Sequence, residues 1–270
     1  MLEIIEDEIV SIEEVENTSL RYDITVEDNH NFFANGILVH NCQNIFGEIQ
    51  KRAGRHQLKG VWNTETQTLE PGQLFVRPEG FQEPTYEVTM KLDGSSMTLF
   101  RWEGWLRVCS RNLELKINDE NAENTFVKMA LKYGDIVPEG FAFQGEIWGE
   151  SIQGNKEGIK GQRFSVFDIF DIQKHEYLSP IKRREMLEDL RALSSVAPVH
   201  HGEQSFEVPD HVPVLGTDWK APESIEDGLK LASGPSIHAK QREGIVWKCN
   251  EDPNFSFKII SNEWLLKHGE

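Results

Sequence analysis

The stretch that most constrains this chain is a pair of predicted β-strands joined by a glycine turn, at residues 86–100. Polar and apolar residues alternate on both sides of Lys91-Leu92-Asp93-Gly94, which predicts two half-buried antiparallel strands. Gly94 allows the backbone to turn sharply and to come close to a ligand. The pattern therefore places Lys91 at the start of the turn, where its amine can act as a nucleophile.

An amine must be neutral to attack a phosphate. Lowering a reference lysine pKa of about 10.4 to about 7 takes about 4.6 kcal/mol of differential interaction. Only neighbouring cations or strong desolvation can supply it. The alternative is a surface lysine beside an aspartate in a hairpin turn, so the choice depends on the residues downstream.

The amino-acid composition indicates a globular protein. The 270 residues are 38% hydrophobic and include 15 Phe and 7 Trp, enough to fill the core of one large domain or two modest ones. There is no apolar run of about 18 residues, and the acidic N-terminus is unlike a presequence. Three cysteines without metal-ligand spacing favour a reducing compartment. We expect no membrane association and a cytoplasmic location.

Charge divides the chain in two. Residues 1–41 carry ten acids and one base, whereas residues 42–270 carry 35 acids and 27 bases, for a total of −17. Such a charge normally argues against a nucleic-acid partner, but its uneven spread marks a domain boundary. Three short predicted strands in the acidic part, 8–15, 20–26 and 31–39, are too few to form a core. We therefore expect residues 1–41 to be a small all-β unit that needs a partner polypeptide.

This unit ends in a reactive tripeptide, His40-Asn41-Cys42. The side-chain amide of Asn41 can attack its own carbonyl carbon, closing a succinimide ring and cutting the chain before Cys42. A neighbouring histidine can assist by proton transfer. The Cys42 thiol is a good acceptor for a thioester. The alternative is an ordinary tripeptide at the end of a strand.

Residues 20–42, with Tyr22-Asp23-Ile24-Thr25-Val26 and the run from His30 to Cys42, resemble the C-terminal end of an intein. The resemblance implies a catalytic set of five residues: Asp23, His30, His40, Asn41 and Cys42. It assigns cyclisation to Asn41 and the first extein position to Cys42. The first nucleophile of an intein belongs to a part that this chain does not contain. The resemblance thus implies the C-terminal half of a split intein (Hint fold) that splices in trans, with a degraded relic as the alternative.

The remaining pattern predicts an α+β domain. Basic residues follow the junction, with helical spacing from Gln43 onward. Further helices and strands are predicted from the periodicity of apolar residues and from helix-capping residues. We expect helices at 121–133, 180–193, 223–232 and after Ser261, and strands at 140–149, 163–172, 242–248 and 255–260. The polar passage up to Pro222 carries no chemical signal.

Charged and aromatic residues lie in or next to the predicted strands. From Tyr86 to Lys258 their order along the sequence resembles that in the covalent nucleotidyltransferase superfamily of ligases and capping enzymes. The resemblance implies an ATP-grasp-like ligase fold of antiparallel sheets with flanking helices. It also implies a set of roles: Lys91 as the nucleophile that takes up AMP, Asp93 and Gly94 as the rest of its motif, Arg111 on the ribose and the acceptor end, Glu146 on the ribose, Phe167 stacked on the purine, Glu243 on the metal, and Lys258 on the phosphates.

Within this superfamily, Phe143-Gln144-Gly145-Glu146 and the run from Ser256 to Asn262 resemble the RNA ligases typified by the Deinococcus nick-sealing enzyme and its phage relatives. Gln43-Asn44 resembles the family's linker after an N-terminal OB domain. Many ligases have a second lysine two positions before the last one. Here that position is Ser256, and Lys248 is the candidate to replace it.

We therefore expect a split-intein fragment at 1–41 and a nucleotidyltransferase domain at 42–270. The predicted activity is ATP-dependent sealing of RNA or nicked duplex ends through lysyl-AMP, with Mg²⁺ or Mn²⁺, in the cytoplasm of a bacterium or a phage-infected host. The predicted partner is a separate polypeptide with the intein N-half and an OB domain. A DNA ligase, a capping-type enzyme and an inactive RNA-binding module are alternatives, and the last is disfavoured because Lys91, Glu146, Glu243 and Lys258 are all present.

Overall fold

The structure is a computed structural model. It describes residues 31–34, 37–40, 45–56, 61–63, 68–70, 76–196 and 207–268. The chain divides into two compact units, Met1–Ile45 and Phe46–Glu270. In the first unit, β1 (Asn31–Ala34) and β2 (Ile37–His40) pair as antiparallel strands. The single strand predicted at 31–39 is therefore two strands, and the predicted strands at 8–15 and 20–26 lie outside the described residues.

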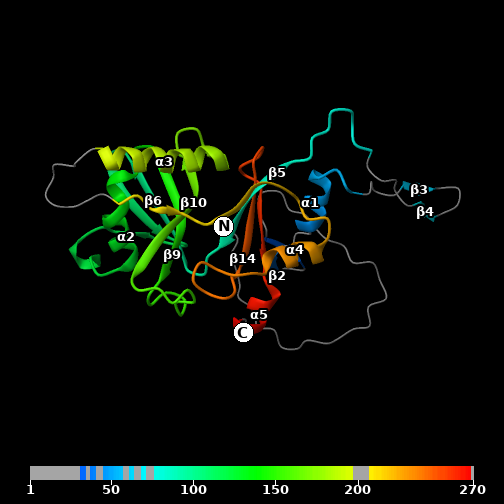
Figure 1. Ribbon diagram of the computed structural model, residues 1–270. Coiled ribbons are helices and arrows are strands. Elements are labelled where there is room, and N and C mark those ends of the chain that lie inside the picture. Colours follow the sequence, from blue (N-terminus) through cyan, green and yellow to red (C-terminus); the bar gives the residue numbers. More distant parts are fainter. Residues whose placement is uncertain are drawn as a thin grey trace. The chain divides into compact units, whose positions relative to one another are not determined.

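The larger sheet of the second unit has seven strands in the order β11-β10-β9-β6-β7-β8, with β12 added parallel to β10 (Figure 1). Its strands are β6 (Ser95–Trp102), β7 (Trp105–Ser110), β8 (Glu114–Leu115), β9 (Phe141–Gly149), β10 (Gln162–Asp171), β11 (Glu176–Tyr177) and β12 (Asp210–His211). Helices α2 (Thr125–Tyr133) and α3 (Pro180–Val196) share a core with it, to which Val127 and Leu187 contribute buried side chains.

The smaller sheet has four strands in the order β13-β5-β14-β15. They are β5 (Thr85–Lys91), β13 (Val214–Lys220), β14 (Gly244–Cys249) and β15 (Ser256–Ile260). Tyr86, Trp247 and Phe257 on one face pack with residues of α1 (Ile45–Arg52) and α4 (Ile225–Ala232). The rings of Trp247 and Phe257 stack at 5.6 Å with an interplanar angle of 9°. The other face of β5 is thereby left to carry Glu87, Thr89 and Lys91.

The antiparallel hairpin predicted at 86–100 is wrong. β5 pairs with β13 and β14, whereas β6 pairs with β7 and β9, so the two strands belong to different sheets. The turn at Leu92–Gly94 is a crossing between sheets. A Cβ on Gly94 would overlap the carbonyl oxygen of Ile147 on β9. The close approach that requires glycine here is to a neighbouring strand.

The other predicted elements are present with shifted ends. Helix α2 begins four residues later than predicted because the side chain of Asn124 accepts a bond from the Phe126 N–H. Ser224 caps α4 in the same way, and α5 (Asn262–His268) follows Ser261 as predicted. Two short strands, β3 (Val61–Asn63) and β4 (Thr68–Glu70), were not predicted.

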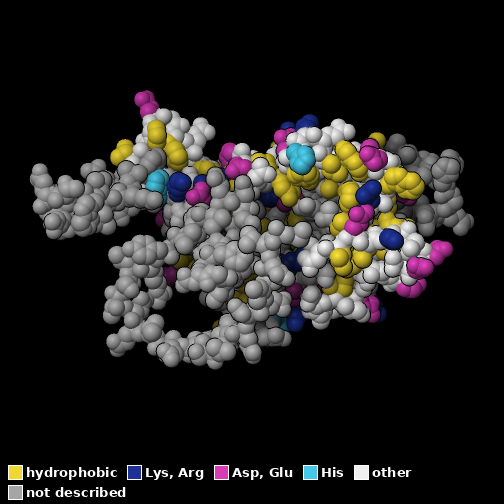
Figure 2. Space-filling model, turned by 180° about the vertical axis from the view of Figure 1, so that it is seen from behind, with side chains coloured by type: hydrophobic (Ala, Val, Ile, Leu, Met, Phe, Trp, Pro, Cys, Tyr) yellow, Lys and Arg dark blue, Asp and Glu magenta, His cyan; other side chains and the backbone are white. Residues whose placement is uncertain are grey.

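The mixed helix and antiparallel-sheet architecture confirms the α+β prediction. Cys109 and Cys249 are free thiols. Within the described ranges, no helix is long and apolar enough to cross a membrane. On the face that Figure 2 shows, acidic and basic side chains are interspersed with apolar ones.

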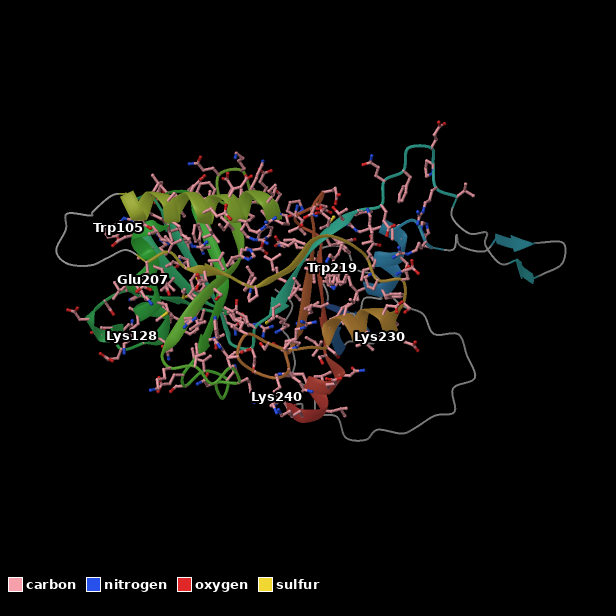
Figure 3. The ribbon with its side chains drawn as sticks, viewed as in Figure 1. Trp105, Lys128, Glu207, Trp219, Lys230 and Lys240 are labelled. Atoms are coloured by element: carbon pink, nitrogen blue, oxygen red, sulfur yellow. The ribbon has the colours of Figure 1, made fainter. Side chains whose placement is uncertain are left out.

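Trp247 should carry much of the stability of the smaller sheet because its ring is fully buried. Trp247→Ala is expected to lower the free energy of unfolding by about 3–5 kcal/mol. Trp105, at the start of β7 and 71% exposed, is the matched control (Figure 3). Trp105→Ala should change stability by less than about 0.5 kcal/mol. Urea denaturation of both variants tests this, and equal losses would contradict the assignment of the core.

Candidate active site

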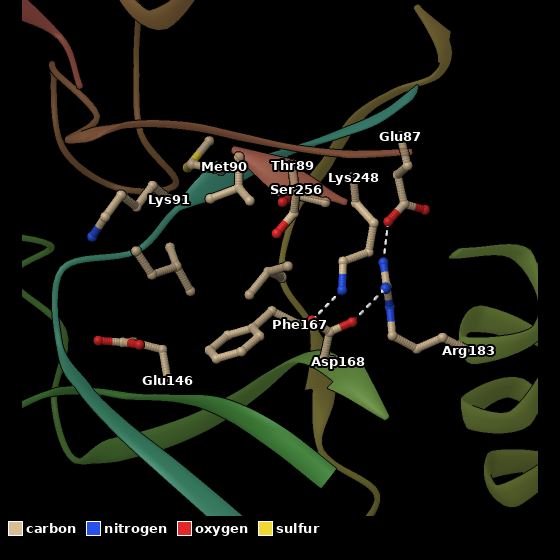
Figure 4. A pocket seen from close by; sticks show the side chains of 13 residues that line it. Glu87, Thr89, Met90, Lys91, Glu146, Phe167, Asp168, Arg183, Lys248 and Ser256 are labelled. Atoms are coloured by element: carbon tan, nitrogen blue, oxygen red, sulfur yellow. Dashed lines mark hydrogen bonds and ion pairs between the residues drawn. The ribbon is translucent and has the colours of Figure 1, made fainter. Parts of the chain in front are cut away.

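A cavity of about 200 Å³ lies on the polar face of β5 (Figure 4). Its wall on the smaller sheet carries Glu87, Thr89 and Lys91 on β5 and their neighbours on β14 and β15. The full lining is Glu87, Thr89, Met90, Lys91, Leu92, Glu146, Phe167, Asp168, Arg183, Val212, Val246, Lys248 and Ser256. Residues from both sheets therefore meet around one space.

Lys91 is an ion-pair partner at one end of this cavity. Its Nζ lies 2.7 Å from both carboxylate oxygens of Glu243. Pairing of Lys91 with Gly244 across β5 and β14 sets this contact, since Glu243 immediately precedes Gly244. A neutral lysine needs neighbouring cations or desolvation, whereas the neighbour of Lys91 in the structure is a carboxylate. Attack by this amine therefore requires that the bond to Glu243 be released.

Three carboxyl groups surround this lysine. Burial raises the pKa of Glu146 to about 7, with the charge of Lys91 opposing and those of Glu243 and Asp93 adding. Burial also raises the pKa of Asp93 and of Glu243. Mutual repulsion makes this end of the cavity favourable for an added cation.

By themselves these groups do not form a metal-binding cluster. In the described part of the chain, no three Asp, Glu, His or Cys side chains are close enough to hold an ion. Mg²⁺ commonly binds through one or two carboxylates together with substrate phosphates. The acidic end around Glu243 and Glu146 fits that mode of binding, in which the substrate completes the coordination.

Phe167 forms the middle of the cavity wall. The pairing of β10 with β9 shifts by one residue between Val166 and Asp168, so Phe167 sits on a bulge. A bulge changes the direction of a side chain in a strand. Phe167 is half-buried and packs against a small cluster that contains Leu92 and Val212. The surface is apolar and suits a flat aromatic ring.

The opposite end of the cavity is a buried network of charges. Arg183, only 1% exposed, bonds to Glu87, and its Nη1 lies 3.1 Å from Oδ1 of Asp168. Lys248 bonds to the other oxygen of Asp168, and burial lowers the Lys248 pKa against the opposing charge of Asp168. Figure 4 shows this network on the far side of Phe167 from Lys91.

His211 completes the network as a neutral ring. Its Nε2 accepts a bond from Nε of Arg183 at 3.0 Å, and its Nδ1 lies 2.5 Å from the carbonyl oxygen of Val212. Burial, followed by the charge of Arg183, lowers the His211 pKa to about 3. These contacts require the proton on Nδ1, where it is donated to Val212.

The structure brings most of the predicted nucleotidyltransferase residues together. Lys91, Glu146, Phe167 and Lys248 line the cavity, and Glu243 contacts Lys91. The remaining predicted residues lie as follows: Asp93 and Gly94 in the crossing turn, Lys258 exposed on β15 with its charge acting on Glu243, Arg111 exposed after β7 and outside the cavity lining, and His40 at the end of β2 in the first unit. Asp23, His30, Asn41 and Cys42 lie outside the described residues.

Sequence reasoning missed Glu87, Asp168, Arg183 and His211. One signal was available for Asp168, an acid inside a mainly apolar strand, since buried charges are usually paired. Glu87 stands in an alternating strand and gave no such signal. Their partners gave no signal of their own. Arg183 is one of several charges in a helix, and His211 belongs to the polar passage.

The cavity combines the groups that binding of a nucleotide requires: an aromatic surface, carboxylates and amines. The RNA ligase family model matches residues 84–260, and the chain therefore belongs to the RNA ligase family.

Solved structures agree with this membership. A mutant of Naegleria gruberi RNA ligase with ATP and Mn is 34% identical, with a TM-score of 0.58, over 84% of this chain and 56% of that one. Another mutant of the same ligase, without ligand, is 40% identical over 70% of this chain and 53% of that one, with a TM-score of 0.55. The chain thus spans about half the length of these ligases.

A different class of protein also matches. DNA polymerases of Thermococcus sp. (strain GE8) and Thermococcus hydrothermalis are 34% and 33% identical over 137 residues. These matches cover 46% of this chain but 7% and 8% of the polymerases. The shared part is therefore a small fraction of each polymerase. In this chain it is longer than the 41 residues of the predicted intein fragment.

His211 should make stability depend on pH. The folded protein keeps this ring neutral down to about pH 3, whereas a histidine in the unfolded chain titrates near pH 6.5. The unfolded state binds more protons between these values, so stability is full above about pH 6.5 and is lost as the pH falls. The expected loss between pH 7 and pH 5 is about 2 kcal/mol.

Denaturant titrations of wild type and of a His211 variant at both pH values measure this loss as a difference, because Glu146, whose pKa burial raises to about 7, gains stability as the pH falls through the same range. His211→Gln, which retains a hydrogen-bonding side chain without the titrating ring, should remove most of it. His238→Gln is the control because His238 is exposed. An unchanged pH dependence in His211→Gln would show that other groups are responsible.

Proposed function

We propose that this protein is an ATP-dependent RNA ligase that forms a covalent lysyl-AMP on Lys91. The observation that carries the proposal is the meeting of Lys91, Glu146 and Phe167 around one cavity, with Glu243 in contact with Lys91. The ATP and Mn in the Naegleria ligase structures support the choice of nucleotide and metal. Membership in the RNA ligase family favours this activity over a DNA ligase or a capping-type enzyme.

The cavity suggests one orientation for ATP. The purine would lie on Phe167, the ribose hydroxyls would bond to Glu146, and the α-phosphate would reach Lys91. A divalent metal held by the acidic end and the phosphates would neutralise their charge and that of the leaving pyrophosphate. In this orientation Lys248, bound to Asp168 beyond Phe167, faces the edge of the base. Lys258 is then the candidate for the phosphates.

Three reactions follow in order. Nζ of Lys91 bonds to the α-phosphorus of ATP while the bond to pyrophosphate breaks. The AMP is transferred from the lysine to a 5′-phosphate end of RNA, and a 3′-hydroxyl then attacks that phosphate and releases AMP. Glu243 must free Lys91 before the first reaction, and a divalent cation bound to its carboxylate would compete with the Lys91 ammonium for that carboxylate.

Adduct formation tests this proposal directly. With labelled ATP and Mg²⁺ or Mn²⁺ the protein should acquire an acid-labile AMP label, and Lys91→Ala should abolish it because the nucleophile is gone. Lys230→Ala is the control, since this lysine on α4 is 77% exposed (Figure 3). Label on the Lys91→Ala protein, or label obtained only with GTP, would overturn the assignment.

A second activity is proposed for residues 1–41, namely trans-splicing as the C-terminal half of a split intein. The reactive sequence His40-Asn41-Cys42 supports it, as does the hairpin of β1 and β2, whose last strand ends at His40. The similarity to a small part of the Thermococcus polymerases is compatible with a segment shared by proteins of different function. The partner would be a polypeptide with the intein N-half and an OB domain.

Two variants separate the proposed splicing steps. Cys42→Ala should block ligation but still permit cleavage, because the acceptor thiol is lost while Asn41 can cyclise. Asn41→Ala should stop at a branched intermediate. The measurement is mass analysis after mixing the chain with its upstream partner polypeptide. Normal splicing by Asn41→Ala, or binding without a joined product, would exclude this activity.

A further inference from the structure

A second cavity, of about 430 Å³, adjoins the candidate active site. Trp148 and Arg163 contribute to it from the larger sheet, helix α3 forms another wall, and the segment 210–214 forms the third. Val212 in that segment lines both cavities. We call the second cavity the arginine groove, after the residues Arg163, Arg184 and Arg191 that line it.

The three guanidinium groups converge from two elements. Arg184 and Arg191 are seven residues apart on α3, which is about two turns and places them on one helix face. Arg163 comes from β10, where it pairs across the sheet with Trp148. Within the described ranges, Arg163 has no carboxylate within 4.0 Å, and its guanidinium lies 5.7 Å from the Trp148 ring. The groove thus holds one cation without an acidic partner.

The other two arginines retain donors for a ligand. Arg184 lies 2.8 Å from Glu87, and Arg191 lies 3.6 Å from Asp210. Arg191 also donates from Nη2 to the carbonyl oxygen of Pro209 at 3.1 Å. A guanidinium has five N–H donors, more than these partners use. With Glu188 and Asp210 as the acids of the lining, the groove carries a net charge of +1 in a protein of net −17. Local positive charge of this kind attracts anions even to an acidic protein.

We propose that the arginine groove binds the phosphate backbone of the RNA substrate next to the nucleotide cavity, on the side of the buried charge network that contains His211. Arginine forks match phosphate oxygens in pairs, and backbone phosphates position a nucleic acid without reading its sequence. A ligase must hold a polynucleotide next to its nucleotide cavity, and this groove shares a wall with that cavity. The inference rests on the proposed RNA ligase activity and adds the place where the strand lies.

The test measures binding of the full chain to a fluorescent RNA duplex with one 5′-phosphorylated nick, by anisotropy across a series of KCl concentrations. Arg163→Gln and Arg191→Gln should each weaken binding about fivefold to tenfold near 0.1 M salt and reduce the salt slope by about 1. Arg163→Lys keeps the charge and should keep the slope. Arg107→Gln is the matched control, since Arg107 is 39% exposed and 3.6 Å from Glu114, against 41% and 3.6 Å for Arg191.

The outcomes distinguish this inference from the proposed activity. If the wild-type protein forms the AMP adduct and the groove variants bind RNA as tightly as wild type, the proposed role of the groove is refuted. The proposed ligase activity is not affected by that result. An equal loss in Arg107→Gln refutes the role of the groove as well, because general charge then explains binding. The groove assignment is also overturned if the groove variants lose adduct formation to the same extent as RNA binding. It is overturned too if these variants lose binding of an acidic peptide rather than binding of RNA. Absence of the adduct in wild type refutes the activity itself.

Discussion

The close contact of Gly94 with β9 is the constraint on which the candidate active site depends. The turn at Leu92–Gly94 carries the chain from the smaller sheet to the larger one, and no other residue type fits against the Ile147 carbonyl there. Immediately after the turn, Ser96 pairs with Glu146. Lys91 at the end of one strand and Glu146 on another sheet are thus fixed relative to each other by backbone contacts. Side-chain packing alone would hold them less rigidly.

The buried charge network imposes a different requirement. Removing one partner of a buried ion pair commonly costs about 3–5 kcal/mol, because the other charge is left unpaired. The buried charge of Arg183 is not left unpaired, because its guanidinium bonds to three acceptors, Glu87, Asp168 and His211. Each of the three comes from a different strand or loop, so the arginine can be satisfied only when both sheets and α3 are assembled. The network therefore ties the two sheets and α3 to one arrangement around the cavity.

The sequence predicted the local features of this fold well. Strand and helix positions followed from hydrophobic periodicity and capping residues. The resemblance to the nucleotidyltransferases, and not spacing alone, singled out Lys91, Glu146, Phe167 and Glu243, which lie close together in the structure. Sheet membership could not be predicted, since alternation within β5 and β6 is the same whether they pair with each other or with distant strands.

Strand β13 was missed for a related reason. Its pairing with β5 shifts near Gly216 and again before Trp219, which removes a regular alternation from the sequence. The start of α2 was predicted too early, and its length was overestimated, because the sequence does not show whether Asn124 lies inside a helix or caps its N-terminus. Arg111 was placed by motif order, and order along the chain does not determine where a loop residue points.

Strand order in the smaller sheet also bears on how the protein is made. β5 has no neighbour from its own part of the chain, since both of its partners, β13 and β14, lie more than 120 residues further on. Contacts of such long sequence separation are slow to form, and synthesis proceeds from the N-terminus. The strand that ends in Lys91 has no sheet neighbour on the ribosome until β13 has emerged, and it cannot pair with β14 until residues near 250 have emerged. The larger sheet around β6, β7 and β9 can assemble well before then, so the surroundings of Lys91 are among the last parts of the molecule to form.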